Sequence, residues 1–240
     1  MDSLELGYAI PPGKIDACLE DCRADPSISL GDVTSQLNLG VSTWPFEWTT
    51  WFHFTRSWRD TDYADGLLGM QGALPRLWER LRLMTQARIS EHDWLQFRDR
   101  FENEDSWING QMYRDKLSFT TEEGGPHAFL IRSEGIQAAE GTGDTRDYTR
   151  PPEIIEDILE ALEEHFETSF LSSFLRETHP RCVTFKHPLP TDDAINIALR
   201  YILNEKSGAE LEPGPTFTSQ GKPIPAADII SIEELGQPWT

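Results

Sequence analysis

The stretch WPFEWTTWFHFTRSW, residues 44–58, decides how the rest of the chain is expected to fold. Aromatic side chains occupy its even positions 44, 46, 48, 52, 54 and 58, whereas its odd positions are mostly polar. Side chains alternate between the two faces of a β-strand, so the pattern predicts a strand with an apolar even face and a largely polar odd face. Burying these aromatics would contribute on the order of 10 kcal/mol before conformational entropy is subtracted. Helices or a second sheet are therefore needed to cover the even face.

One aromatic residue, Trp51, stands on the odd face and interrupts its polar pattern. Large aromatic side chains often act as anchors of binding surfaces, because they bury much area at little entropic cost. We therefore expect Trp51 to lie at a ligand pocket or a partner interface, and the even face to form the core.

Amphipathic helices are predicted on the C-terminal side of this strand. Apolar residues recur at spacings of three and four in the segments 67–86, 90–103, 152–177 and 191–205. That spacing places them along one side of an α-helix. Ser90 has the residue type and position of an N-cap for the second of these helices. The predicted fold class is therefore α+β, with an antiparallel sheet organised around strand 44–58 and covered by these helices.

Shorter segments complete the expected secondary structure. The strand-like runs 113–121 and 127–132 flank a Gly-Gly-Pro turn and predict a β-hairpin. Residues 181–186 predict a further strand, residues 12–25 a short helix, and residues 229–235 a helical turn.

The length favours one domain. A chain of 240 residues lies near the upper size for a single hydrophobic core. Residues 133–152 are poor in large apolar side chains, so they predict a long exposed loop or a weak domain boundary. We expect a single α+β domain over residues 1–240.

The charge balance restricts the class of partner. The chain carries 41 acidic and 21 basic residues, for a formal net charge of −20. A field of this sign opposes binding to nucleic-acid phosphates or anionic membranes, and it favours a basic protein partner. We therefore expect no nucleic-acid and no membrane partner. The alternative is that the charge serves only to keep the protein in solution.

Several features predict a soluble, cytoplasmic protein. The N-terminus has neither the basic segment nor the apolar run of a signal peptide. Nowhere does the chain hold the run of about 18 apolar residues that a membrane helix needs. The 3 cysteines form an odd and small set, which argues against a disulfide framework.

The sequence contains no motif typical of a metal or cofactor site. Its 6 histidines are scattered without a pair at ligand spacing, and no glycine-rich phosphate loop or nucleophile elbow is present. We therefore predict no cofactor and no metal site. One catalytic hypothesis combines His53 on the polar face of the strand with Asp60, Asp62 or Asp65 in the following loop. Imidazole and carboxylate can act as an acid/base pair, so this hypothesis predicts an enzyme acting on a small molecule.

Acidic residues concentrate on the helix predicted over 152–177. The residues expected to form its partner-binding face, together with Trp51, are Glu156, Glu160, Glu163, Glu164 and Glu167. Few basic residues balance them, so the pairs at a spacing of four are mainly like-charged. The leading hypothesis is therefore a non-catalytic binding protein that neutralises a basic partner, as a toxin-immunity or inhibitor protein would. A structural or assembly subunit is a third hypothesis, and no oligomeric state is predicted.

Overall fold

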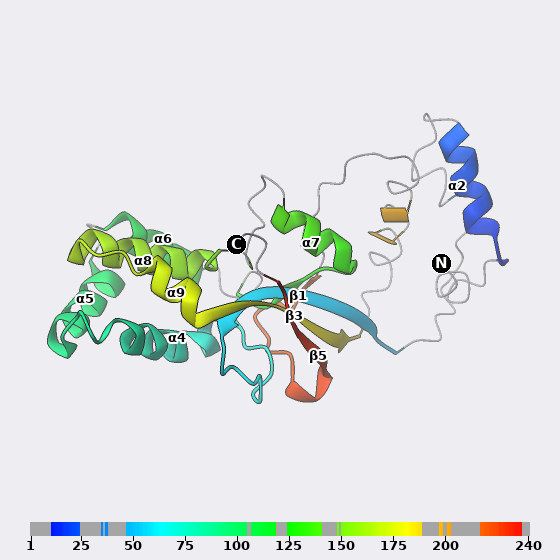
Figure 1. Ribbon diagram of the computed structural model, residues 1–240. Helices are drawn as coiled ribbons and strands as arrows, with labels where there is room; N and C mark the ends of the chain where they lie inside the picture. Colours follow the sequence, from blue (N-terminus) through cyan, green and yellow to red (C-terminus); the bar gives the residue numbers. More distant parts are fainter. Residues whose placement is uncertain are drawn as a thin grey trace.

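The computed structural model of this chain describes residues 11–24, 35, 37, 47–104, 107–118, 124–140, 148, 150–188, 197–198, 201–202 and 217–236. The described part has helices and antiparallel sheets, which confirms the predicted α+β class. A group of helices packs at one end of the main sheet, and α7 (Arg132–Glu140) lies on one face of it (Figure 1).

The main sheet contains the aromatic strand as an outer strand. It has three strands in the order β1-β3-β5, namely β1 (Thr49–Trp58), β3 (Thr178–His187) and β5 (Ile229–Glu234). Strand β1 pairs with β3 along its whole length, from Thr49 opposite His187 to Trp58 opposite Thr178. The strand predicted at 44–58 is thus confirmed over residues 49–58, and the strand predicted at 181–186 is confirmed as part of β3, which is the middle strand of the sheet. Residues 44–46 lie outside the described residues. A smaller sheet consists of β2 (His127–Ala128) and β4 (Phe217–Thr218).

Both faces of β1 contribute buried residues, which corrects the prediction of a single core face. On the odd face, Trp51 is 0% exposed and packs against Phe217 with ring centroids 4.9 Å apart. On the even face, Phe54 is also buried and meets Phe129 edge-on at 5.7 Å. Trp48, an even-face aromatic, is instead 50% exposed. The segment containing β4 covers one face and α7 covers the other, so alternation along the strand does not distinguish a core face from a solvent face.

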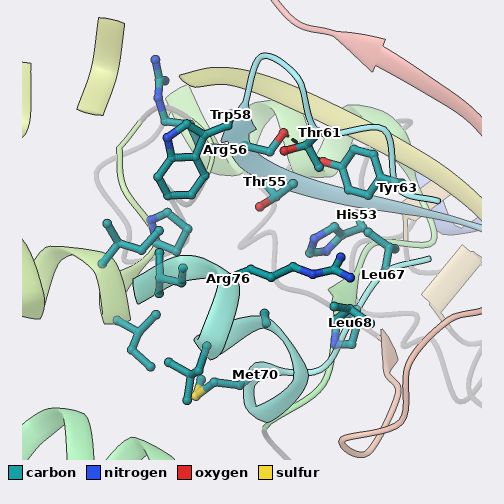
Figure 2. A pocket seen from close by; sticks show the side chains of 18 of the residues that line it. His53, Thr55, Arg56, Trp58, Thr61, Tyr63, Leu67, Leu68, Met70 and Arg76 are labelled. Atoms are coloured by element: carbon teal, nitrogen blue, oxygen red, sulfur yellow. Dashed lines mark hydrogen bonds between the residues drawn. The ribbon is translucent and has the colours of Figure 1, made fainter. Parts of the chain in front are cut away.

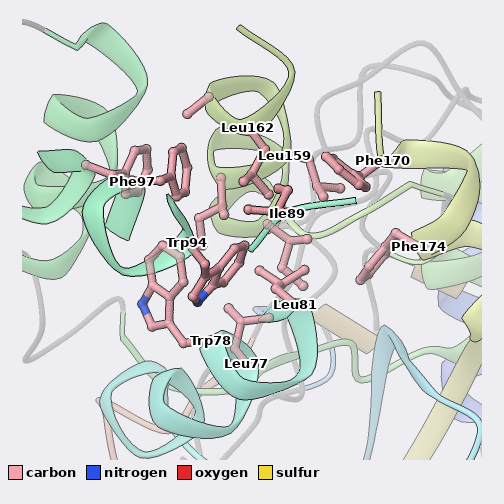
Figure 3. Packing of buried hydrophobic residues seen from close by; sticks show 14 of the residues in the cluster. Leu77, Trp78, Leu81, Ile89, Trp94, Phe97, Leu159, Leu162, Phe170 and Phe174 are labelled. Carbon is pink, nitrogen blue, oxygen red and sulfur yellow. The ribbon is translucent and has the colours of Figure 1, made fainter. Parts of the chain in front are cut away.

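Two of the predicted helices form where expected. Helix α4 (Met70–Thr85) and helix α5 (Glu91–Asn103) confirm the segments predicted at 67–86 and 90–103. Ser90 caps α5, because its hydroxyl oxygen accepts a hydrogen bond from the backbone N–H of Asp93 at 3.2 Å. Trp78 of α4 and Trp94 of α5 meet edge-on in the helical core, with ring centroids 5.9 Å apart (Figure 3).

The helix predicted over 152–177 is two helices, α8 (Glu153–Phe166) and α9 (Leu171–Glu177). Glu167 ends α8 in the left-handed region, with φ 51°. The break changes the direction of the chain, so that Phe170 and Phe174 both become buried in the helical core (Figure 3).

The predicted hairpin of 113–121 and 127–132 is wrong, because Ile108–Ser118 form helix α6 and β2 pairs with β4. Tyr113 shows the physical reason. Its side chain is buried in the helical core, and its hydroxyl accepts a hydrogen bond from Trp78 Nε1 at 3.1 Å. Packing against α4 therefore outweighs the local preference for a strand.

The predicted helical turn at 229–235 is also wrong, because Ile229–Glu234 form strand β5. Leu235 donates its N–H to the carbonyl of Pro180 at 2.9 Å and continues the pairing with β3. The β-branched isoleucines of this segment suit a pleated strand, and β3 supplies the edge with which they pair.

Helix α7 occupies the start of the segment 133–152, so the loop predicted there is wrong over that part. Gly135 lets α7 approach β1, because an added Cβ would lie 2.1 Å from the ring of Phe54. Residues 141–147 and 149 lie outside the described residues, and the division into domains stays a prediction.

Two further helices are predicted from the sequence, at 12–25 and at 191–205. Helix α2 (Lys14–Ala24) confirms the helix predicted at 12–25. The helix predicted at 191–205 lies largely outside the described residues, and within it residues 197–198 and 201–202 are helical.

Candidate functional site

A pocket of about 1000 Å³ opens between β1 and α4. The loop 60–68 and the first turn of α8 close it on two further sides. His53 and Thr55 reach the pocket from β1, and Arg76 extends into it from α4 (Figure 2). The pocket therefore lies where the sheet meets the helical part of the molecule.

The loop after β1 folds back over the odd face of the strand. Gly66 makes this possible, because its φ of 81° lies in the left-handed region and an added Cβ would lie 2.0 Å from the carbonyl oxygen of Ile224. Leu67 then donates its N–H to the same carbonyl at 2.9 Å. Arg181 of β3 holds the other end of the loop, because its guanidinium donates to the carbonyls of Thr61 at 2.7 Å and Arg59 at 2.8 Å.

Two ion pairs tie this loop to α4. Arg76 pairs with Asp65, and Arg80, one turn further along the helix, pairs with Asp60 at 2.7 Å. The hydrogen bond from Arg80 lowers the pKa of the Asp60 carboxyl. Asp62 is exposed and accepts the N–H of Ala64 at 3.0 Å. Asp60 and Asp65 therefore hold the loop against the helix.

His53 is engaged by a backbone carbonyl rather than by these aspartates. Its Nδ1 lies 2.7 Å from the carbonyl oxygen of His127, so Nδ1 carries the proton and donates it. Burial lowers the pKa of the His53 imidazole, which keeps the ring neutral. Nε2 is then a hydrogen-bond acceptor. The structure brings His53, Asp60, Asp62 and Asp65 to one pocket, but an acid/base pair among them stays a prediction.

Sequence reasoning missed several pocket residues. Thr55 and Ser57 follow His53 at a spacing of two on the same strand face, so the alternation of β1 could have shown them. Arg76 and Tyr63 carry no such signal, because the fold of the loop and the placement of α4 bring them there.

The acidic residues predicted as a partner surface lie on α8. Glu160, Glu163, Glu164 and Glu167 are exposed, whereas Glu156 is partly buried. The opposite side of α8 is fixed in the helical core, because Ile158 and Leu162 are fully buried.

The structure does not bring Trp51 to this surface. Trp51 lies in the core of the sheet, in a cluster with Phe185 and Phe217. The prediction that it lies at an interface or pocket is therefore corrected. The reason is that the segment containing β4 covers the face on which Trp51 stands.

The described residues contain no group of three or more His, Cys, Asp or Glu side chains placed to hold a metal ion. Cys18 and Cys182 are buried free thiols, and burial raises the pKa of Cys182 to about 11. None of the helices in the described part of the chain has the length and apolar character needed to span a membrane. Comparisons with models of known families, with curated proteins and with solved structures find no match for this chain.

Proposed function

We propose that this protein is a non-catalytic binding protein whose acidic face on α8 docks on a basic partner. The acidic face consists of Glu160, Glu163, Glu164 and Glu167. The observation that supports the proposal is that these carboxylates are exposed and, within the described chain, form no ion pair with Lys or Arg.

On helix α5, in contrast, acidic residues form ion pairs with basic residues of the same helix. On α5, Arg98 pairs with Glu102 at 3.2 Å and Arg100 with Glu104 at 3.1 Å. Such pairs at a spacing of four stabilise a helix by about 0.2–0.5 kcal/mol each, and like-charged pairs destabilise it by similar amounts. The acidic face contains like-charged pairs of this spacing, namely Glu160 with Glu164 and Glu163 with Glu167.

This arrangement fits recognition by charge. The core side of α8 supplies the stability of the helix, so the acidic face is available for a partner. A partner rich in Lys and Arg would relieve the repulsion within the face and would be steered toward it over a distance. Neutralisation of a basic protein, in the manner of an immunity or inhibitor protein, is the role that we propose.

The test begins with a pull-down from the native host and identification of the captured partner by mass spectrometry. Affinity is then measured at low and high salt for the wild type and for Glu160→Lys/Glu163→Lys. We expect the double variant to bind about tenfold more weakly or worse, and salt to weaken wild-type binding.

A matched control separates the acidic face from net charge. Glu20→Lys/Asp21→Lys makes the same charge change on exposed positions of α2. We expect this control to retain wild-type affinity within about threefold, because charges outside the contact area act mainly on the association rate through long-range attraction. Equal weakening by both double variants, or unchanged affinity with no salt dependence, would refute the proposal.

A further inference from the structure

We infer that the pocket between β1 and α4 binds a neutral, hydroxyl-bearing small molecule with one apolar face, of the size and class of a mono- or disaccharide. The inference rests on the pocket residues and is independent of the acidic face of α8. Three properties of the lining carry it: its matched charges, a polar wall and an apolar wall.

The charges of the lining balance in number, because it contains four basic residues, Arg56, Arg76, Arg80 and Lys116, and four acidic residues, Asp60, Asp62, Asp65 and Glu153. Arg76 pairs with Asp65, Arg80 with Asp60, and Lys116 with Glu153. A charged ligand would meet no excess of opposite charge in this lining, and it would lose part of its hydration on entering a partly enclosed site. The lining therefore favours an uncharged ligand.

The polar wall is made by one face of β1. His53, Thr55 and Ser57 stand on this face at a spacing of two and line the pocket. The Nε2 of His53 can only accept, since Nδ1 donates to the His127 carbonyl. Ser57 Oγ accepts from the Tyr63 hydroxyl at 3.1 Å, which leaves its own proton to donate. Hydroxyl groups both donate and accept, so a polyhydroxylated ligand matches this mixed set.

The apolar wall is made by α4. Met70, Ala73, Leu74 and Leu77 line the pocket at positions i, i+3, i+4 and i+7, which form one stripe of the helix. Trp58 adds an aromatic ring at the end of β1 (Figure 2). The C–H face of a sugar ring packs on such surfaces, while its hydroxyls project from the edge of the ring and can reach the polar wall.

The volume agrees with this ligand class. Small-molecule pockets measure about 300–1000 Å³, and this pocket of about 1000 Å³ stands at the upper end. A single ring with bound water or two linked rings would fill it.

The test is isothermal titration calorimetry of the full chain with a panel of sugars. Methyl glucoside, maltose and cellobiose are the neutral probes, and glucuronate and glucosamine are ring-matched charged probes. We expect saturable binding of at least one neutral sugar, and binding about tenfold or more weaker for both charged analogues.

Two variants locate the binding. Thr55→Val removes one hydroxyl at nearly constant volume and is expected to weaken the sugar about fivefold or more. Thr49→Val is its control, because Thr49 lies on the same strand outside the pocket and should leave affinity unchanged. If Thr55→Val does not fold, His53→Gln, which keeps a donor and an acceptor, is the pocket variant whose sugar affinity is measured instead.

Three results would overturn the inference. They are no saturable binding of any neutral probe at millimolar concentration, charged analogues that bind as tightly as neutral ones, or pocket variants that bind like the wild type while circular dichroism shows them folded.

Discussion

The guanidinium of Arg56 donates from Nε to the hydroxyl of Thr178 at 2.9 Å and thereby joins β1 to the end of α9. Arg56 is only 4% exposed, and its other nitrogens donate to the carbonyls of Tyr148 and Leu175, both at 3.2 Å. Thr178 in turn donates to the carbonyl of Phe174 at 2.7 Å. The carbonyls of Phe174 and Leu175 lie near the C-terminal, negative end of α9, where a cation is favourable. Burial lowers the pKa of the Arg56 guanidinium, so these acceptors offset the cost of an enclosed charge.

The first prediction concerns this connection. Arg56→Met should lower the free energy of unfolding by about 2–4 kcal/mol, because it leaves several buried carbonyls without a donor. Arg88→Met is the control, since Arg88 is exposed, and it should cost less than about 0.5 kcal/mol. Urea denaturation measures both. Similar losses in the two variants would show that Arg56 does not support the junction of sheet and helices.

The second prediction compares two tryptophans of the aromatic stretch. Trp51→Ala should cost about 3–5 kcal/mol, because it empties a fully buried site. Trp48→Ala should cost below about 1 kcal/mol, because half of that side chain is already exposed. Thermal and chemical unfolding of the pair test the assignment of faces. A larger loss at Trp48 than at Trp51 would contradict the packing of β1.

The third prediction is a pH dependence caused by His53. Burial holds the pKa of its imidazole below the unfolded value, which is about 6.5. Between these two pKa values the unfolded chain binds a proton that the folded chain does not. Stability is therefore fully present above the unfolded pKa and is lost as the pH falls through it, by at most about 1.4 kcal/mol per pH unit.

Urea unfolding between about pH 7.5 and pH 5.5 measures this dependence. His53→Gln should remove this part of the slope, whereas His92→Gln, at an exposed position, should retain it. An identical slope in the wild type and in His53→Gln would exclude His53 as its source.

The fourth prediction concerns the ion pair between Lys116 of α6 and Asp157 of α8. Their charged atoms lie 2.8 Å apart, and the Asp157 side chain is only 8% exposed. Burial raises the pKa of Asp157, and Lys116 offsets part of that effect. Lys116→Met should cost about 2–3 kcal/mol, because it leaves an enclosed carboxylate unpaired.

The double variant Lys116→Met/Asp157→Leu provides the check on this interpretation. Removing both charges should cost less than removing Lys116 alone, since no buried charge then lacks a partner. A double variant that is less stable than Lys116→Met would indicate that packing, not charge, determines the effect.

The local sequence was sufficient to predict those helices and strands whose sequence patterns extend over only a few neighbouring residues. The three-and-four spacing of α4 predicted that helix, and Ser90 marked the start of α5, because both signals depend only on short-range backbone geometry. The β period of residues 44–58 likewise predicted strand β1, whereas the middle position of β3 in the sheet depends on pairing between distant segments. The acidic side of α8 follows from the same kind of periodicity.

Only the tertiary structure decided which faces are buried and which residues meet. Trp51 is buried because the distant segment containing β4 covers it, and Tyr113 is helical because Trp78 of α4 packs against it. The pocket arises in the same way, since β1, α4 and the loop between them contribute separate walls. Alternation along a strand specifies which side chains share a face. Burial depends on whether another part of the chain lies against that face, and for β1 both faces are covered by segments remote in sequence.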